Sequence, residues 1–238
     1  MDALDRVEPV ARDLLARVDA TLVRHGAPPD HPIWTDLRRL GTVPGDAVAF
    51  FHRTDGTDLR SAAARLRNQA EQYTVAAIPP DVHWHSTAGE SYSAHASALA
   101  AHLSSEAAPG AGSGTGAGAG ADESTMAGRL RATADYAEAV ADWFCRSRDG
   151  MAMALADVLA SAEALTMRSP AHPESTVAAG VVTAAADIGA HVLSAAAMAR
   201  AAGHDLLYDS QGRLDLLVYR APALSQRYRF DTTIDLSR

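Results

Sequence analysis

Apolar residues recur every three or four positions along much of this chain, which is the spacing of one face of an α-helix. The pattern is clearest between Asp58 and Leu103, where Pro79-Pro80 separates two apolar rows. The first row consists of Leu59, Ala63, Leu66, Ala70, Tyr73 and Ala77. The second row consists of Ala88, Tyr92, Ala96, Leu99 and Leu103. Because the connection is short, the pattern predicts an antiparallel helical hairpin over residues 56–105, whose apolar seam needs a partner in this chain or another.

Shorter segments with the same periodicity precede this hairpin. Residues 3–24 are predicted to form a helix with Asp2 as its N-cap. A second, short helix is predicted from Pro32 to Leu40, where Gly41 closes it. A further helical piece is predicted over residues 47–51.

Glycine occupies every second position from Gly110 to Gly120. This composition is typical of a flexible tether, and we expect a linker over residues 109–121. It joins a predicted N-terminal domain, residues 1–108, to the rest of the chain. Nucleotide binding is not expected there, because no strand precedes the glycines and no lysine follows them.

The chain after the linker returns to helical periodicity. One helix is predicted over residues 122–145 and a second over residues 151–167, with Ser147-Arg-Asp-Gly150 as the turn between them. A long Ala-rich helix is then predicted over residues 174–202, stopped by Gly203.

The last part of the chain changes character. Residues 206–208 and 214–219 alternate like short strands around residues 209–212, which predicts a small β-hairpin within the segment 205–238. The predicted fold is therefore all-α, built of antiparallel helical hairpins or a bundle, with a small C-terminal β-hairpin. The helical segment 122–204 carries an apolar stripe of its own, so we expect the two halves to pack in cis as a four-helix bundle.

Composition argues against several classes of site and partner. The chain has no lysine among its 21 basic residues, which excludes a Walker A loop and a Schiff-base lysine. The formal charge of −8 argues against nucleic acid as a partner. The single cysteine, Cys145, excludes an intramolecular disulfide and is interpreted as a structural thiol. Residues 1–24 do not resemble a signal peptide, and stable membrane insertion is not expected, because charged residues and a histidine interrupt the most apolar stretch, 176–202.

Candidate chemistry is sparse. His95 and His102 share a helical face but lie about 10 Å apart along the axis, too far for one metal ion. His83 and His85 would point to opposite sides of an extended segment. The chain contains no G-x-S-x-G motif and no convincing pair of carboxylates in an apolar setting. We therefore predict no enzyme activity, no metal site and no cofactor.

Four residues around the predicted bend form a pattern. Trp84 stands in the bend, Ser86 follows two residues later, and Ala88 comes soon after. Tyr92 is an aromatic residue eight positions past the tryptophan. With these residues, the segment over residues 56–105 resembles the WXG (Trp-x-Gly) helical-hairpin proteins of type VII, or ESX, secretion, which have glycine where this chain has Ser86.

The resemblance implies a protein that works in type VII secretion through helix packing and without catalysis. It would be a secreted substrate, or a helical partner or chaperone of one. The implied packing residues are Trp84, Ser86, Ala88 and Tyr92 near the bend, with Leu59, Leu66, Tyr73, Leu99 and Leu103 along the seam. None of the six tyrosines is followed four residues later by Asp or Glu, as the family's Tyr-x-x-x-Asp/Glu export signal requires.

Three questions stay open at this level: the location, the partner and the function. The expected location is the cytoplasm, with secretion by a leaderless type VII route as the second possibility. The partner is either another helical protein, WXG-like or a secretion chaperone, or the other half of the same chain. A cytosolic helical scaffold, or a toxin-neutralising partner unrelated to export, would satisfy the same apolar pattern.

Overall fold

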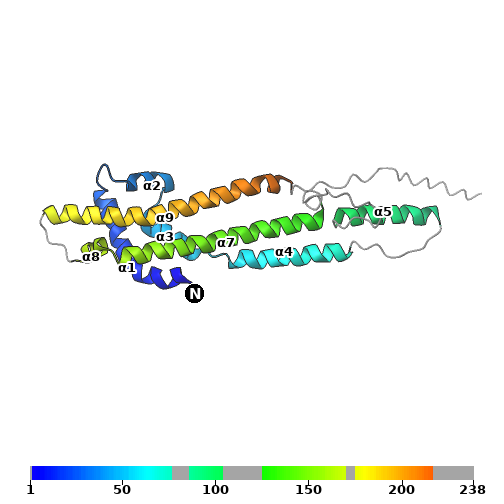
Figure 1. Cartoon of the computed structure of the whole chain (residues 1–238), viewed down its shortest axis with the longest axis horizontal. Coiled ribbons are helices and arrows are strands. Elements are labelled where there is room, and N and C mark those ends of the chain that lie inside the picture. Colours follow the sequence, from blue (N-terminus) through cyan, green and yellow to red (C-terminus); the bar gives the residue numbers. More distant parts are fainter. Residues whose placement is uncertain (1, 77–85, 104–124, 170–174, 217–238) are drawn as a thin grey trace, which may run out of the picture.

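A computed structural model describes residues 2–76, 86–103, 125–169 and 175–216 of the chain. Within these ranges the protein is helical and contains no β-strand, which confirms the all-α prediction (Figure 1). The helices are α1 (Ala3–His25), α2 (Ile33–Leu40), α3 (Pro44–Arg53), α4 (Thr57–Ala76), α5 (Thr87–Leu103), α7 (Met126–Leu159), α8 (Ala162–Arg168) and α9 (Ser175–Leu216).

Local signals set the start of α1 and the end of α2 as the sequence predicts, whereas α3 begins at Pro44, before the predicted helical piece of residues 47–51. The Asp2 side chain accepts a hydrogen bond from the Asp5 backbone nitrogen at 3.0 Å, and the Asp5 side chain accepts one from Asp2, forming a reciprocal cap on α1. Gly41 closes α2 in a left-handed conformation, φ 67°, which glycine adopts without steric cost. Pro44 opens α3, where its fixed φ suits the first helical turn.

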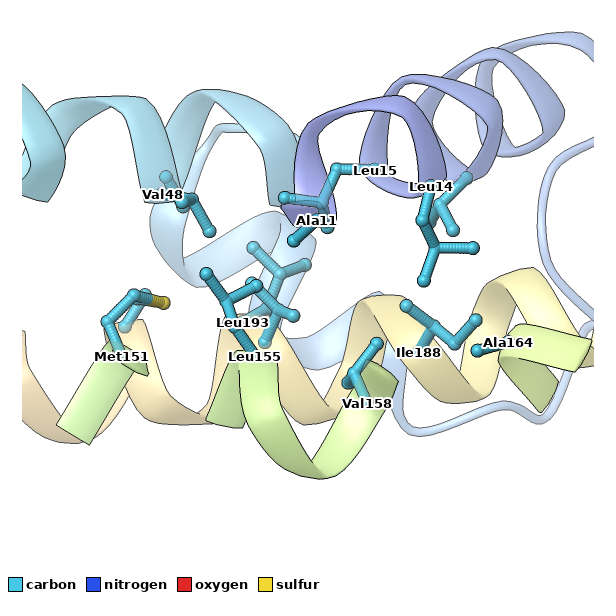
Figure 2. Close-up of a cluster of buried hydrophobic side chains, with 14 of the residues drawn as sticks. Ala11, Leu14, Leu15, Val48, Met151, Leu155, Val158, Ala164, Ile188 and Leu193 are labelled. Atoms are coloured by element: carbon cyan, nitrogen blue, oxygen red, sulfur yellow. The ribbon is translucent and has the colours of Figure 1, made fainter. Parts of the chain in front are cut away.

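A core of buried apolar side chains lies at one end of the molecule, where α1 packs against α7 and α9 (Figure 1 and Figure 2). Leu14 and Leu15 of α1 meet Leu155 of α7 and Ile188 and Leu193 of α9, and each of the five is at most 3% exposed. Burial of a leucine or isoleucine side chain contributes about 1.5–3 kcal/mol. Segments on both sides of the predicted linker, whose residues lie outside the described ranges, thus build one core.

The other end of the molecule is a slender arm (Figure 1). There α4 runs antiparallel to α7, because Arg60 pairs with Asp142 whereas Arg67, two turns further along α4, pairs with Asp135. Helix α7 lies between α4 and α9 in this arm. The main partner of α4 is therefore α7, and its contact with α5 is slight.

The predicted turn at Ser147-Arg-Asp-Gly150 is wrong, because α7 continues through it to Leu159. These residues have turn-forming character, but Ser147 and Arg148 are buried, and the Arg148 side chain is bound by groups from two other helices. Gly150 costs about 1 kcal/mol within a helix. Tertiary contacts outweigh that local preference.

Two predictions fail along α9. The helix passes through Gly203 and continues to Leu216, so the glycine does not stop it. The predicted C-terminal β-hairpin is not seen, because residues 206–216, which include its first strand and its turn, are helical. A glycine in a helix costs only about 1 kcal/mol, which packing can offset, and Gly203 sits against the ring of Trp143. The remaining hairpin residues lie outside the described part of the chain.

Candidate partner-binding surface

The arm is held together by small residues that repeat every seven positions on both helices. Gly56, Ala63 and Ala70 lie on the α4 side, and Ala127, Ala134 and Ala141 lie on α7; all six are buried. A Cβ atom added at Gly56 would come within 2.8 Å of the Ala141 backbone, so these two residues are in direct contact. Because the helices are antiparallel, the same register places Ala63 opposite Ala134 and Ala70 opposite Ala127. Only residues of this size allow two helix backbones to approach so closely.

Ion pairs border this small-residue seam. An Arg60 terminal nitrogen lies 2.9 Å from Asp142 Oδ1 and 3.3 Å from Cys145 Sγ. Arg67 pairs with Asp135 at 2.9 Å and also with Glu138, and hydrogen bonding to these two carboxylates raises its pKa. All these charged groups are substantially exposed to solvent, which screens the attraction, so the pairs add little to the stability of the arm. Their main effect is to fix the register of α4 on α7, and they contribute little to the free energy of the contact between the two helices.

The predicted seam residues of α4 are only partly enclosed. Leu59 and Leu66 are half-buried, and Tyr73, near the end of the arm, is 39% exposed. The alanines between them carry the contact with α7. The seam was therefore predicted on the correct face of α4, but its principal partner within the chain is α7.

The predicted seam residues of α5 lie mostly at the surface. Tyr92 is 47% exposed and Leu99 is 56% exposed, while Ala88 is exposed and Leu103 is half-buried. Ser86 caps α5, because its Oγ accepts a hydrogen bond from the Gly89 backbone nitrogen at 3.2 Å. We call the row of Ala88, Tyr92, Leu99 and Leu103 the α5 face. Trp84, the residue on which the family resemblance centres, lies outside the described residues.

A cavity of about 200 Å³ lies in the arm between α7 and α9. Its lining is mixed, because Ala132, Ala139 and Leu206 are apolar whereas Asp135, Asp209 and Arg213 are charged. Next to it on α9, Leu207 and Tyr208 are exposed. In the core end of the molecule α1 and α3 cover α7 and α9, but they do not extend into the arm (Figure 1).

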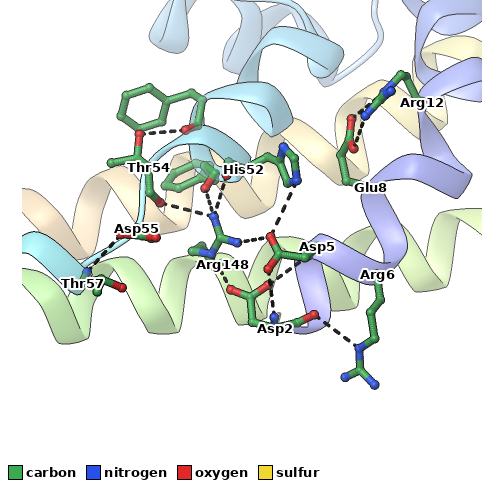
Figure 3. Close-up of polar contacts among 12 residues, drawn as sticks. Asp2, Asp5, Arg6, Glu8, Arg12, His52, Thr54, Asp55, Thr57 and Arg148 are labelled. Carbon is green, nitrogen blue, oxygen red and sulfur yellow. Dashed lines mark hydrogen bonds and ion pairs between the residues drawn. The ribbon is translucent and has the colours of Figure 1, made fainter.

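A buried arginine joins three helices where the arm meets the core (Figure 3). The Arg148 side chain donates to Asp2 Oδ2 at 2.5 Å and to Asp5 Oδ1 at 2.6 Å, both on α1 or its cap. It also donates to the backbone carbonyls of Phe51 and His52, at 2.5 and 2.9 Å, which end α3. Hydrogen bonding to Arg148 lowers the pKa of Asp2 to about 2. Every contact made by this charge is internal, so the cluster supports the fold.

An acidic cavity of about 210 Å³ lies where α7, α8 and α9 meet. Asp157, Glu163, Asp187 and His191 line it. His191 Nε2 is 3.6 Å from Asp157 Oδ2, and the Asp187 carboxylate instead pairs with His31 Nε2 at 3.0 Å. Among the described residues no three His, Cys, Asp or Glu side chains converge as metal ligands.

Helix α9 contains a stretch, Ala179–Arg213, that is long and apolar enough to cross a membrane by length and composition alone. More than half of its most apolar window is buried inside the protein, as in the core helix of a folded domain. Comparison with family models, with curated proteins and with solved structures gives no match to this chain.

Proposed function

We propose that this protein is a type VII secretion-associated helical protein, either an exported substrate or a helical partner of one, and that it acts by packing helices against another protein. The proposal rests on the resemblance around Trp84, Ser86 and Tyr92. One structural observation supports it: the α5 face is apolar in sequence and yet largely exposed within the chain. Large apolar side chains at helical spacing on a surface are typical of an interaction site.

The rest of the architecture is consistent with a protein that binds another protein. The apolar seam of α4 is occupied by α7, so it is not free for a partner. Among the residues that the structure describes, α5 makes only slight contact with α4 and α7. A partner helix placed there would bury the exposed parts of Tyr92 and Leu99, which carry most of the apolar area of the face.

Export can be measured directly in a host with an active type VII system. We expect the tagged protein in the culture supernatant, and its loss when that system is inactivated. Leu99→Glu on the α5 face should reduce export at least tenfold. Val23→Glu, at an exposed position of α1 (78% exposed), is the matched control and should leave export unchanged.

Secretion that is independent of the type VII system would contradict the proposal. Retention of the protein in the cytoplasm, with no effect of Leu99→Glu on any co-purifying protein, would favour the cytosolic scaffold instead. Both variants should retain wild-type circular dichroism, because both positions are exposed.

A further inference from the structure

The arm has a charged side and an apolar side. On α4, Arg60 and Arg67 lie on one side of the small-residue seam and pair with Asp142 and Asp135 of α7. These pairs show that the charged rows of the two antiparallel helices face the same way. The rows on the opposite side of the seam must therefore also lie together.

Those opposite rows are apolar. Successive residues of an α-helix are turned by about 100°, so the residue before each α4 arginine lies across the seam from it. The same rotation places the residues three positions after each seam alanine on that side of α7. We call this surface the open face; it consists of Leu59, Leu66 and Tyr73 on α4 and Leu130, Ala137, Val140 and Phe144 on α7. These side chains are half-buried or exposed, and none of them is charged.

The open face continues a row of α7 that is covered in the core. The seven-residue spacing that ends with Phe144 in the arm leads on to Met151 and Val158. Met151 is 1% exposed and Val158 is 3% exposed, in the core that α7 shares with α1 and α3. Neither α1 nor α3 extends into the arm, and α9 lies on the other side of α7 from α4 (Figure 1). Among the described helices, only α5 has a contact with the arm end of this surface, and that contact is slight.

Helix α5 matches the open face in length and pattern. Its apolar row from Ala88 to Leu103 is about 22 Å long, and the row from Leu59 to Tyr73 is about 21 Å long. Figure 1 shows α5 beyond the end of α7, and Leu99 in the middle of its row is 56% exposed. A lone helix of this length is at best marginally stable in water, because most helical stability comes from packing of an apolar face. Helix α5 therefore gains stability wherever its row is buried.

We propose that the chain has a closed state, in which α5 folds back along α4 and lies on the open face, so that the two apolar surfaces cover each other. Ten residues separate Ala76, the last residue of α4, from Thr87, the first of α5. Packed helices lie about 8–10 Å apart, a distance that a connection of this length spans. Because both surfaces belong to one chain, their association does not depend on protein concentration.

The closed state regulates the surface that the proposed function assigns to the partner. A partner helix and the open face compete for Tyr92 and Leu99, so a partner binds only by displacing α5. This consequence rests on the proposed function, whereas the closed state does not. Both tests below use purified protein without a secretion system, so failure of the closed state and failure of export are separate results.

The first test is amide hydrogen exchange in the intact chain. Leu66→Glu places a charge on the open face and should speed exchange of the α5 amides at least about tenfold. Asn68→Glu, at an exposed α4 position outside the open face, is the matched control and should leave α5 exchange unchanged. Equally fast α5 exchange in the wild type and in both variants would overturn the proposal.

The second test does not depend on the stability of the arm. Leu99→Cys is combined with Ala62→Cys or with Leu66→Cys, two positions one turn apart on the apolar side of α4, in a Cys145→Ser background. At least one pair should form a disulfide within the monomer, whereas Leu99→Cys with Ala64→Cys, on the charged side, should remain reduced. If neither pair formed a disulfide, the closed state would be excluded. A disulfide only between two chains would also contradict it, and would assign the open face to α5 of a second copy.

Discussion

The close contact between α4 and α7 at Gly56 predicts that substitution of this glycine by alanine destabilises the protein. Substitution by alanine would place a methyl group 2.8 Å from the Cα, Cβ and backbone oxygen of Ala141, about 0.6 Å closer than the 3.4 Å at which ordinary contacts begin. Two of these atoms belong to the backbone of α7 and the third is the Cβ of an alanine, so none of them can rotate away. The φ angle of Gly56 is not positive, so the backbone itself tolerates alanine and the entire cost comes from overlap.

Overpacking of this kind costs about 1–3 kcal/mol. For a chain of this size, each 1 kcal/mol lowers the melting temperature by about 2–4 °C. Gly56→Ala should therefore melt about 2–12 °C below the wild type in a circular dichroism thermal scan.

Gly150 provides the matched control, because it lies within α7 with no atom within 4 Å of an added Cβ. Gly150→Ala should raise stability by up to about 1 kcal/mol through helix propensity alone. If Gly56→Ala were as stable as the wild type, or more stable, α4 could not lie against α7 at the distance described here.

Three further predictions concern the polar contacts. Arg148→Met should lower the free energy of unfolding by about 2–4 kcal/mol, measured by urea denaturation. The substitution leaves the carboxylates of Asp2 and Asp5 and the carbonyls at the end of α3 without their hydrogen-bond donor. An unchanged urea midpoint would show that the cluster does not contribute to stability. The pKa of Asp2 is lowered to about 2, so its contribution is present above pH 3.8 and lost as the pH falls towards 2; Asp2→Asn should flatten that part of the stability curve, and a curve parallel to wild type would refute the assignment. Ser86→Ala should fray the start of α5 at a cost of about 1 kcal/mol, measured by amide hydrogen exchange, because it removes the side-chain cap. Thr87→Ala should leave amide exchange at the start of α5 unchanged. If both substitutions increased exchange equally, Ser86 would not be the cap.

Much of the helical framework could be predicted from the sequence, because periodicity and helix caps are local. The apolar rows of residues 59–73, the cap at Asp2 and the closure at Gly41 all correspond to observed features. The turn expected around Gly150 and the stop expected at Gly203 were not found. Both errors arise from residues whose local preference is outweighed by contacts with distant helices, which a single sequence does not reveal.

The pairing of α4 could have been predicted in part. The seven-residue repeat of Gly56, Ala63 and Ala70 is present in the sequence, as is that of Ala134 and Ala141. The larger apolar residues between them give a stronger periodic signal, so the small residues alone do not identify the contact face. The ion-pair partners of Arg60 and Arg67 could not be predicted, because they depend on which of several antiparallel registers the helices adopt. The role of Arg148 also depends on α1 and α3 meeting at one point on α7.

The measurement that tests the central claim most directly is disulfide formation across the seam of α4 and α7. Cysteines at Ala63 and Ala134, in a Cys145→Ser background, should form an intramolecular disulfide in the monomer. A control pair at Ala63 and Ala141, displaced by about 10 Å along the helix axis, should remain reduced. Equal oxidation of both pairs, or a disulfide found only between two chains, would contradict the small-residue seam within one molecule.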